Sequence, residues 1–83
     1  MMKTARSPDQ LGELMRQARK AKSQSQSDVG RTASVTQKTI SRLENGDDAI
    51  QLATLFDVLT ALDLELVVQP RTESDAADIE DIF

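Results

Sequence analysis

Hydrophobic side chains recur one helical turn apart along most of this chain. Residues three or four positions apart share one face of a helix, so the two longest sets predict helices over residues 8–21 and 51–62. The first set is Leu11, Leu14, Met15, Ala18 and Ala21, and the second is Leu52, Leu55, Phe56, Leu59 and Leu62. Asp63 is expected to end the second of these helices. Two shorter helices are predicted between them from the core pairs Val29 with Ala33 and Ile40 with Leu43.

Two segments carry clear helix-start signals. In residues 7–10, SPDQ, Ser7 can cap the first helix, the proline takes the first helical position and the glutamine completes an S-x-x-Q capping box. Thr36 is a favourable N-cap for the third helix, and Gly46 can end that helix in a left-handed backbone conformation. The third helix therefore lies between Thr36 and Gly46.

The run KSQSQSDVG, residues 22–30, has the composition of a flexible linker. Ser25 and Asp28 within it nevertheless match the capping box that precedes an apolar run, which predicts a second helix over residues 26–33. Gly30 costs such a helix about 1 kcal/mol relative to alanine. A glycine in that place suggests that another backbone passes close to it.

A short β-prone segment follows the last helix. Residues 64–69, LELVVQ, precede Pro70 and place three apolar side chains on one face of a strand, namely Leu64, Leu66 and Val68. No second strand is predicted in this chain, so we expect the segment to pair with its copy in a homodimer across a two-fold axis. The alternative is that it continues the last helix and packs in the core.

Charge is divided between the two halves of the chain. Residues 3–46 carry nine Lys and Arg against four Asp and Glu, whereas residues 47–83 carry Arg71 alone against ten acidic residues. These sums of +5 and −9 give the net charge of −4. Such a split indicates two partners, one anionic and one basic or apolar, although uneven charge can also arise by chance.

The composition argues against several classes of protein. The chain has no cysteine and no histidine, no Gly-rich phosphate loop and no convergent carboxylates beside a nucleophile, so we expect neither an enzyme, a cofactor nor a metal site. No apolar stretch approaches the roughly 20 residues that span a membrane, and residues 1–6 do not resemble a secretory signal. We expect a soluble, cytoplasmic protein.

The second and third predicted helices, joined by a tight turn, describe a helix-turn-helix. Residues 26–30 and 34–46, including the run TISRLENG, resemble the lambda-repressor-like (Cro/C1, or XRE) family, and the resemblance covers roughly residues 10–63. It implies an all-α, four-helix DNA-binding domain. In such a domain the third helix enters the major groove of operator DNA while the second crosses the phosphate backbone.

The side chains on the exposed face of the third helix suit that role. Gln37 can pair with adenine, and Arg42 and Lys38 can reach guanine or phosphate. Thr36 and Gln26, at the two helix starts, suit phosphate oxygens. Contacts of second rank are Thr39, Ser41 and Asn45. Outside such a motif, the same residues would read as an ordinary solvated helix face.

The resemblance also implies one structural ion pair, and the chain departs from the family pattern at two positions. Arg19 and Glu44 match an ion pair that ties the first helix to the end of the third. The chain departs from the family pattern at Gly30, where alanine is usual, and at Ser34, where the turn usually has glycine. Ser34 must therefore tolerate a positive φ or alter the turn, at a cost of about 1 kcal/mol. Because of both departures, we expect the second helix to be the least stable.

Within this family, the strand that replaces a fifth helix and the short acidic tail are similar to the HipB-type antitoxins. That resemblance implies an autoregulating repressor that is a homodimer, binds a palindromic operator and binds a HipA-like serine/threonine kinase toxin. The expected organisation is a disordered N-terminus over residues 1–6, the domain with its dimerisation strand over 7–69 and an acidic disordered tail over 70–83. Tail residues that can contact the toxin are Ile79, Ile82 and Phe83. Two alternatives for the tail stay open, a flexible handle for proteolysis and a solubilising disordered end.

Two other functions remain open from the sequence. One is a free-standing transcriptional regulator, of prophage or metabolic type, with no toxin partner. The other is an adaptor that uses its helix-turn-helix only for protein contacts.

Overall fold

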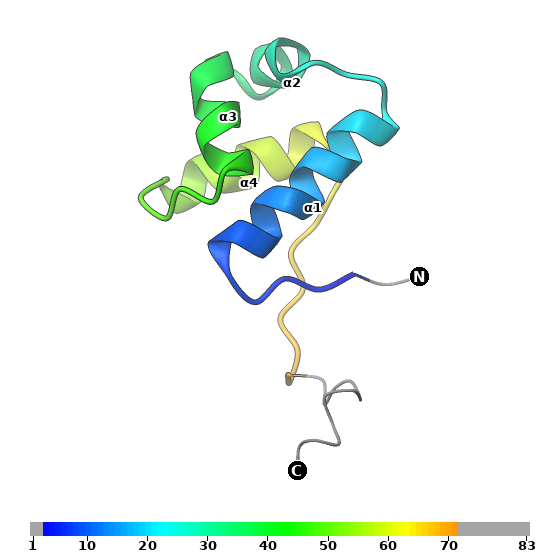
Figure 1. The fold of residues 1–83 in the computed structure, drawn as a ribbon, viewed down its shortest axis with the longest axis vertical. Helices are drawn as coiled ribbons and strands as arrows, with labels where there is room; N and C mark the ends of the chain where they lie inside the picture. Colours follow the sequence, from blue (N-terminus) through cyan, green and yellow to red (C-terminus); the bar gives the residue numbers. More distant parts are fainter. Residues whose placement is uncertain (1–2, 72–83) are drawn as a thin grey trace.

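The computed structural model describes residues 3–71 and consists of four helices. They are α1 (Pro8–Ala21), α2 (Gln26–Ala33), α3 (Gln37–Glu44) and α4 (Leu52–Ala61). In Figure 1, α2 and α3 lie together at one end of the molecule, above α1 and α4. The predicted all-α four-helix fold is confirmed. No helix within residues 3–71 is both long enough and apolar enough to cross a membrane.

Capping boxes account for how closely α1 and α2 follow their predicted bounds. The Ser25 hydroxyl accepts the N–H of Asp28 at 3.0 Å, and the Asp28 carboxylate accepts the N–H of Ser25 at 2.9 Å. At α1 the arrangement is shifted, because Ser7 accepts the N–H of Gln10 while the Gln10 side chain accepts the N–H of Arg6. The run that looked like a linker therefore contains the start of α2.

Each helix ends in the same backbone turn, a Schellman motif in which one residue adopts a positive φ. The residues in that conformation are Ser23, Ser34, Gly46 and Asp63, of which only one is a glycine. Ser34 has a φ of 61°, so it adopts the positive φ that this turn requires and that glycine usually provides. Asp63, at φ 58°, ends α4 as predicted.

The core lies between all four helices. Its buried members are Met15, Val29, Ala33, Ile40, Leu43, Val58, Leu59 and Leu62. The prediction for α4 was wrong in part, because Val58 is buried whereas Leu52 and Phe56 are exposed. The reason is that α4 is apolar on more than one face, so helical spacing alone does not identify the buried one. Ala21, assigned to the apolar stripe of α1, is also exposed.

Two glycines allow backbone segments to approach closely. A Cβ atom on Gly12 would lie 2.5 Å from the carbonyl oxygen of Leu43, so α1 packs directly against the end of α3. A Cβ atom on Gly30 would lie 2.8 Å from the carbonyl oxygen of Val35. The close neighbour expected at Gly30 is therefore the turn between α2 and α3.

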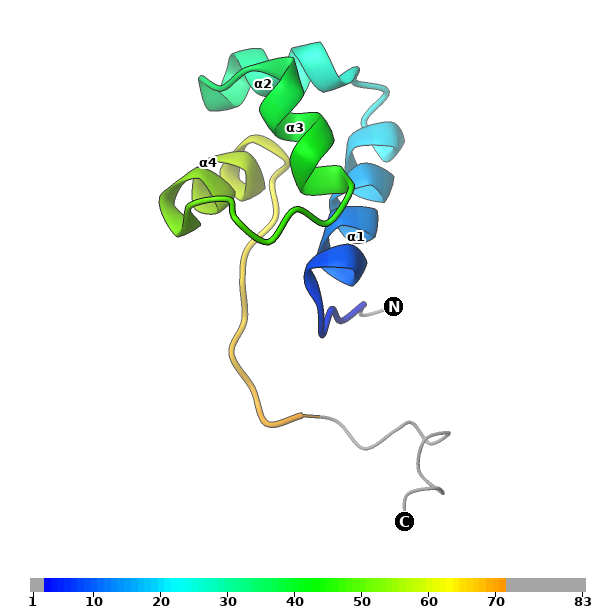
Figure 2. The ribbon, with the colours of Figure 1, turned by 60° about the vertical axis from the view of Figure 1, so that its left-hand side comes forward.

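Residues 64–71 leave the helices at the end opposite α2 and α3, as both ribbon views show (Figures 1 and 2). They belong to no helix or strand in the single chain, and Leu66, Val67 and Val68 are exposed. This excludes the alternative that the segment continues α4 into the core. Pairing with a second copy stays a prediction. The predicted tail beyond Arg71, with Ile79, Ile82 and Phe83, lies outside the described residues.

Candidate nucleic-acid interface

Helix α3 has one buried face and one exposed polar face. Ile40 and Leu43 point into the core, while the side chains of Gln37, Lys38, Arg42 and Asn45 are exposed. The hydroxyl of Thr36 caps the helix by accepting the N–H of Thr39 at 3.1 Å. This arrangement follows from the one-turn spacing of the two apolar residues, and it presents a row of donors and acceptors to the solvent.

A chain of hydrogen bonds links α1 to the start of α3. Arg19 donates to both carboxylate oxygens of Glu44, at 2.6 and 3.1 Å, so the predicted ion pair is present. Arg19 also donates to the carbonyl oxygen of Gln24 at 2.9 Å. The amide of Gln26 donates to Glu44 at 3.0 Å, and the amide of Gln37 in turn donates to Gln26. The exposed Gln37 is thus held by a network that begins at the buried side chains of Arg19 and Glu44.

Electrostatics at Glu44 favour its charged form. Burial of this carboxylate opposes ionisation, but the hydrogen bonds from Arg19 and Gln26 outweigh burial and lower the pKa of Glu44. The pKa of Arg19 is raised, chiefly by its hydrogen bond to Glu44. The pair is well shielded from water, since the two side chains are only 11% and 5% exposed.

The remaining predicted contact residues divide into two groups. Lys38 and Asn45 are exposed, and within residues 3–71 Lys38 forms no ion pair. Thr39 and Ser41 are half-buried, and the Thr39 hydroxyl lies 3.1 Å from that of Thr36. The predicted set therefore gathers on one surface formed by α3 and the start of α2.

Sequence reasoning did not identify the role of Asp47. Its carboxylate accepts a hydrogen bond from Nε of Arg42 at 2.7 Å, directly beside the exposed face of α3. The available signal was the Asn45–Gly46 helix end, because a turn of that kind brings the residue after the glycine back to the last turn of the helix.

Comparison with known proteins places this geometry in a family. The helix-turn-helix family matches residues 15–69. Antitoxin HipB of Escherichia coli O6:H1 (strain CFT073) is 31% identical over 78 residues, which cover 92% of this chain and 83% of that protein. An uncharacterized HTH-type transcriptional regulator, y4dL of Sinorhizobium fredii, is 36% identical over 76% of this chain, but the chain spans only about a third (32%) of its length.

Solved structures that contain HipB are similar to this chain in both sequence and fold. A HipB–O4 20mer complex and a HipA–HipB–O2–O3 complex each contain a chain that is 30% identical with a TM-score of 0.79. In both, the match covers 86% of this chain and the whole of the other. The chain therefore belongs to the helix-turn-helix family, as a DNA-binding regulator of the XRE type related to the HipB antitoxins.

Proposed function

We propose that this chain is the antitoxin of a HipBA-type toxin–antitoxin system, which represses its own operon and binds a HipA-like kinase toxin. The proposal that the chain binds operator DNA rests on the exposed face of α3, which is held by the hydrogen-bond network from Arg19 to Gln37. The toxin half is supported by the likeness to a chain in a complex named for both HipA and HipB. A cytoplasmic, nucleoid-associated location follows from this proposal.

The exposed face of α3 would enter the major groove of operator DNA. Gln37 and Arg42 offer donors to base edges, and Lys38, which forms no ion pair within residues 3–71, offers its charge to phosphate. Gln26 and Thr36 lie at the starts of α2 and α3, where free backbone N–H groups favour phosphate oxygens. Thr39, Ser41 and Asn45 would add contacts at the border of the same surface.

Dimerisation would come from residues 64–69. The segment lines a groove with the N-terminal residues, α1 and α4, and its apolar side chains remain exposed together with Leu52 and Phe56 of α4. An unpaired extended segment beside exposed apolar side chains favours pairing with a second copy of this chain. A dimer would present two α3 helices to the half-sites of a palindrome.

Light scattering at micromolar concentration tests this dimer. The wild-type chain should have the mass of two copies, and Leu66→Asp should give a monomer because it places a charge on the paired apolar face. Val67→Asp is the matched control, since Val67 would lie on the other face of the proposed strand. A monomeric wild type, or a dimeric Leu66→Asp variant, would contradict the shared strand.

Co-expression tests the toxin half. A HipA-type kinase encoded beside this gene should co-purify with the full chain, and truncation after Arg71 should remove the kinase while leaving DNA binding intact. Ile79, Ile82 and Phe83 are the residues proposed to make that contact. Absence of any adjacent kinase gene, together with no co-purifying protein, would favour the free-standing regulator, which the likeness to y4dL also allows.

A further inference from the structure

The exposed Arg42 is held on one side by a carboxylate. Nε of Arg42 donates to Oδ2 of Asp47 at 2.7 Å, and this is the one hydrogen bond that the Arg42 side chain makes within residues 3–71. Both terminal nitrogens of the guanidinium therefore keep their N–H donors for a ligand. The two side chains are 45% and 28% exposed, so the pair lies at the surface and not in the core.

The backbone brings this pair together. Gly46 has φ +84°, which reverses the chain after α3. Its N–H donates to the carbonyl of Leu43 at 3.1 Å, and the N–H of Asp47 donates to the carbonyl of Arg42 at 3.0 Å. These two bonds define a Schellman motif, in which the residue after the glycine returns to the residue five positions earlier. Asp47 thus bonds Arg42 through both its backbone and its side chain.

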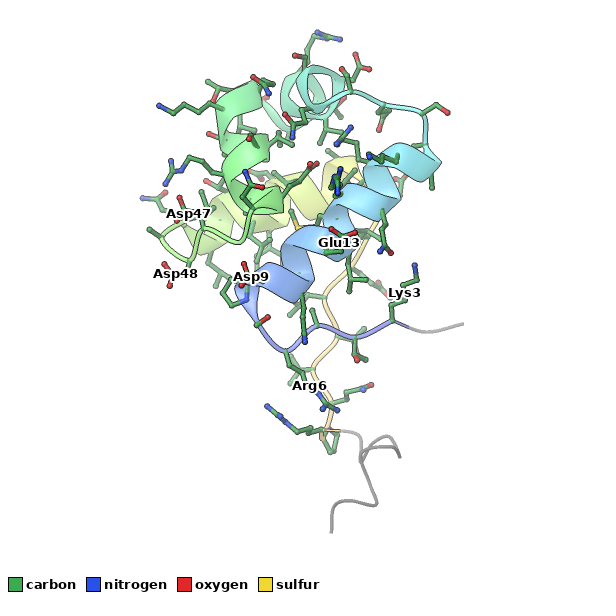
Figure 3. All side chains as sticks on the ribbon, in the orientation of Figure 1. Lys3, Arg6, Asp9, Glu13, Asp47 and Asp48 are labelled. Atoms are coloured by element: carbon green, nitrogen blue, oxygen red, sulfur yellow. The ribbon has the colours of Figure 1, made fainter. Side chains whose placement is uncertain are left out.

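The carboxylate of Asp47 is itself fixed. Its other oxygen, Oδ1, accepts the N–H of Ala49 at 2.8 Å. That bond, followed by the bond from Arg42, lowers the pKa of Asp47, so the group is ionised at neutral pH. The neighbouring Asp48 is an exposed carboxylate on the same loop (Figure 3). The two aspartates are adjacent in the chain, but only Asp47 bonds Arg42.

We propose that Asp47 is a positioning residue, which holds the guanidinium of Arg42 so that its terminal nitrogens read one guanine in the major groove. This inference rests on the proposed function of α3. A guanidinium already paired with an anion is attracted less to phosphate, and its fixed orientation suits the bidentate geometry of guanine O6 and N7. Because Asp47 already orders the Arg42 side chain in the free protein, less side-chain entropy is lost when Arg42 binds DNA.

The experiment compares four variants on defined DNA. The probes are a duplex enriched by the wild-type chain from a random-sequence library and a scrambled duplex of the same length. The variants are Asp47→Asn, Asp48→Asn, Arg42→Ala and the double change at Arg42 and Asp47. Each aspartate variant removes one negative charge, so both should bind the scrambled duplex somewhat more tightly. Asparagine at position 47 keeps an oxygen for the N–H of Ala49.

We expect Asp47→Asn to reduce the preference for the enriched duplex by roughly 5-fold or more, because a bidentate arginine–guanine contact carries roughly 5- to 150-fold of discrimination. Asp48→Asn should leave the preference unchanged. In the Arg42→Ala background, Asp47→Asn should have no further effect. A second selection with Asp47→Asn should relax the sequence at the same base pair as Arg42→Ala. A merely structural role would not alter one base pair alone.

Three results would overturn the inference. Equal preferences for Asp47→Asn and Asp48→Asn, while Arg42→Ala loses preference, would contradict positioning but leave the proposed function intact. If Asp47→Asn bound both duplexes more tightly and kept the full preference, Asp47 would compete with DNA for the guanidinium of Arg42 instead of positioning it. An unchanged preference after Arg42→Ala would contradict the proposed role of Arg42 and, with it, this inference. The preference is the ratio of the affinities for the enriched and the scrambled duplex, measured on one protein sample. Partial unfolding of a variant lowers both affinities equally and does not change this ratio.

Discussion

The ion pair between Arg19 and Glu44 allows a direct test of how α3 is held. Arg19→Met removes the guanidinium but keeps a long apolar side chain. The Glu44 carboxylate, 5% exposed, would then keep, within residues 3–71, only the hydrogen bond from Gln26, and the carbonyl of Gln24 would lose the hydrogen bond from Arg19. Removing one partner of a buried ion pair costs roughly 3–5 kcal/mol, much of it the penalty of leaving the other charge unpaired.

That loss is large for a domain of this size. Native proteins are stable by about 5–15 kcal/mol, so the variant should retain little margin against unfolding. A small domain loses about 4–8 °C of melting temperature per kcal/mol, which corresponds here to a fall of at least about 12 °C. Urea denaturation, followed by circular dichroism, measures the free energy of unfolding directly.

Two comparisons make the result decisive. Arg16→Met is the matched control on the same helix, because Arg16 lies 3.7 Å from Glu13 in a pair that is about half exposed, and its loss should cost less than about 1 kcal/mol. Replacing Arg19 and Glu44 together by methionine and leucine should cost less than the sum of the single changes. A loss for Arg19→Met no larger than that of the control, or strictly additive losses, would refute the reasoning.

Three further predictions concern stability. Ser34→Gly should raise the free energy of unfolding by about 0.5–1 kcal/mol, because glycine removes the strain of a positive φ; a urea titration that shows a loss would contradict this. Gly12→Ala should lower it by about 1–3 kcal/mol, since the new Cβ would meet the backbone of Leu43, and a stabilised variant would refute the close approach. The free energy of unfolding should fall on acidification, because the folded-state pKa values of Glu44 and Asp28 lie below their ordinary values. The stabilisation from these two ionised carboxylates is fully present above about pH 4.5, the ordinary value for Glu44, and is lost as the pH falls through their folded-state pKa values. Glu44→Gln should weaken this acid dependence in pH-resolved unfolding measurements, and an unchanged dependence would contradict it.

Much of the fold could be predicted because the sequence signals were local. The bounds of α2 followed from one capping box, and the polar face of α3 followed from the one-turn spacing of Ile40 and Leu43. The buried face of α4 could not be chosen, because Val58 and Phe56 are both apolar and only tertiary packing distinguishes them.

The site was predicted less completely than the fold. The chain from Arg19 to Gln37 needs three elements in space, and the family resemblance supplied only its ion pair. Asp47 was missed because its contact with Arg42 arises from a chain reversal, which helical periodicity does not describe. The proposed pairing of residues 64–69 would involve a second copy of the chain, and in the single chain these residues belong to no strand.

The central claim is that the exposed face of α3 reads DNA sequence, and titration of a fluorescent duplex tests it directly. The probes are the duplex enriched by the wild-type chain and its scrambled counterpart, each measured over a range of salt concentrations. Lys22→Ala is the charge-matched control for Lys38→Ala, because Lys22 lies beyond the end of α1 and pairs with Asp63.

We expect affinity to fall linearly with the logarithm of salt concentration, and Lys38→Ala to reduce that slope by about 1. Arg42→Ala should lose roughly 5- to 150-fold of the preference for the enriched duplex, whereas Lys22→Ala should keep both the slope and the preference. Salt-insensitive or absent DNA binding, or an Arg42→Ala variant that retains the full preference, would contradict the account.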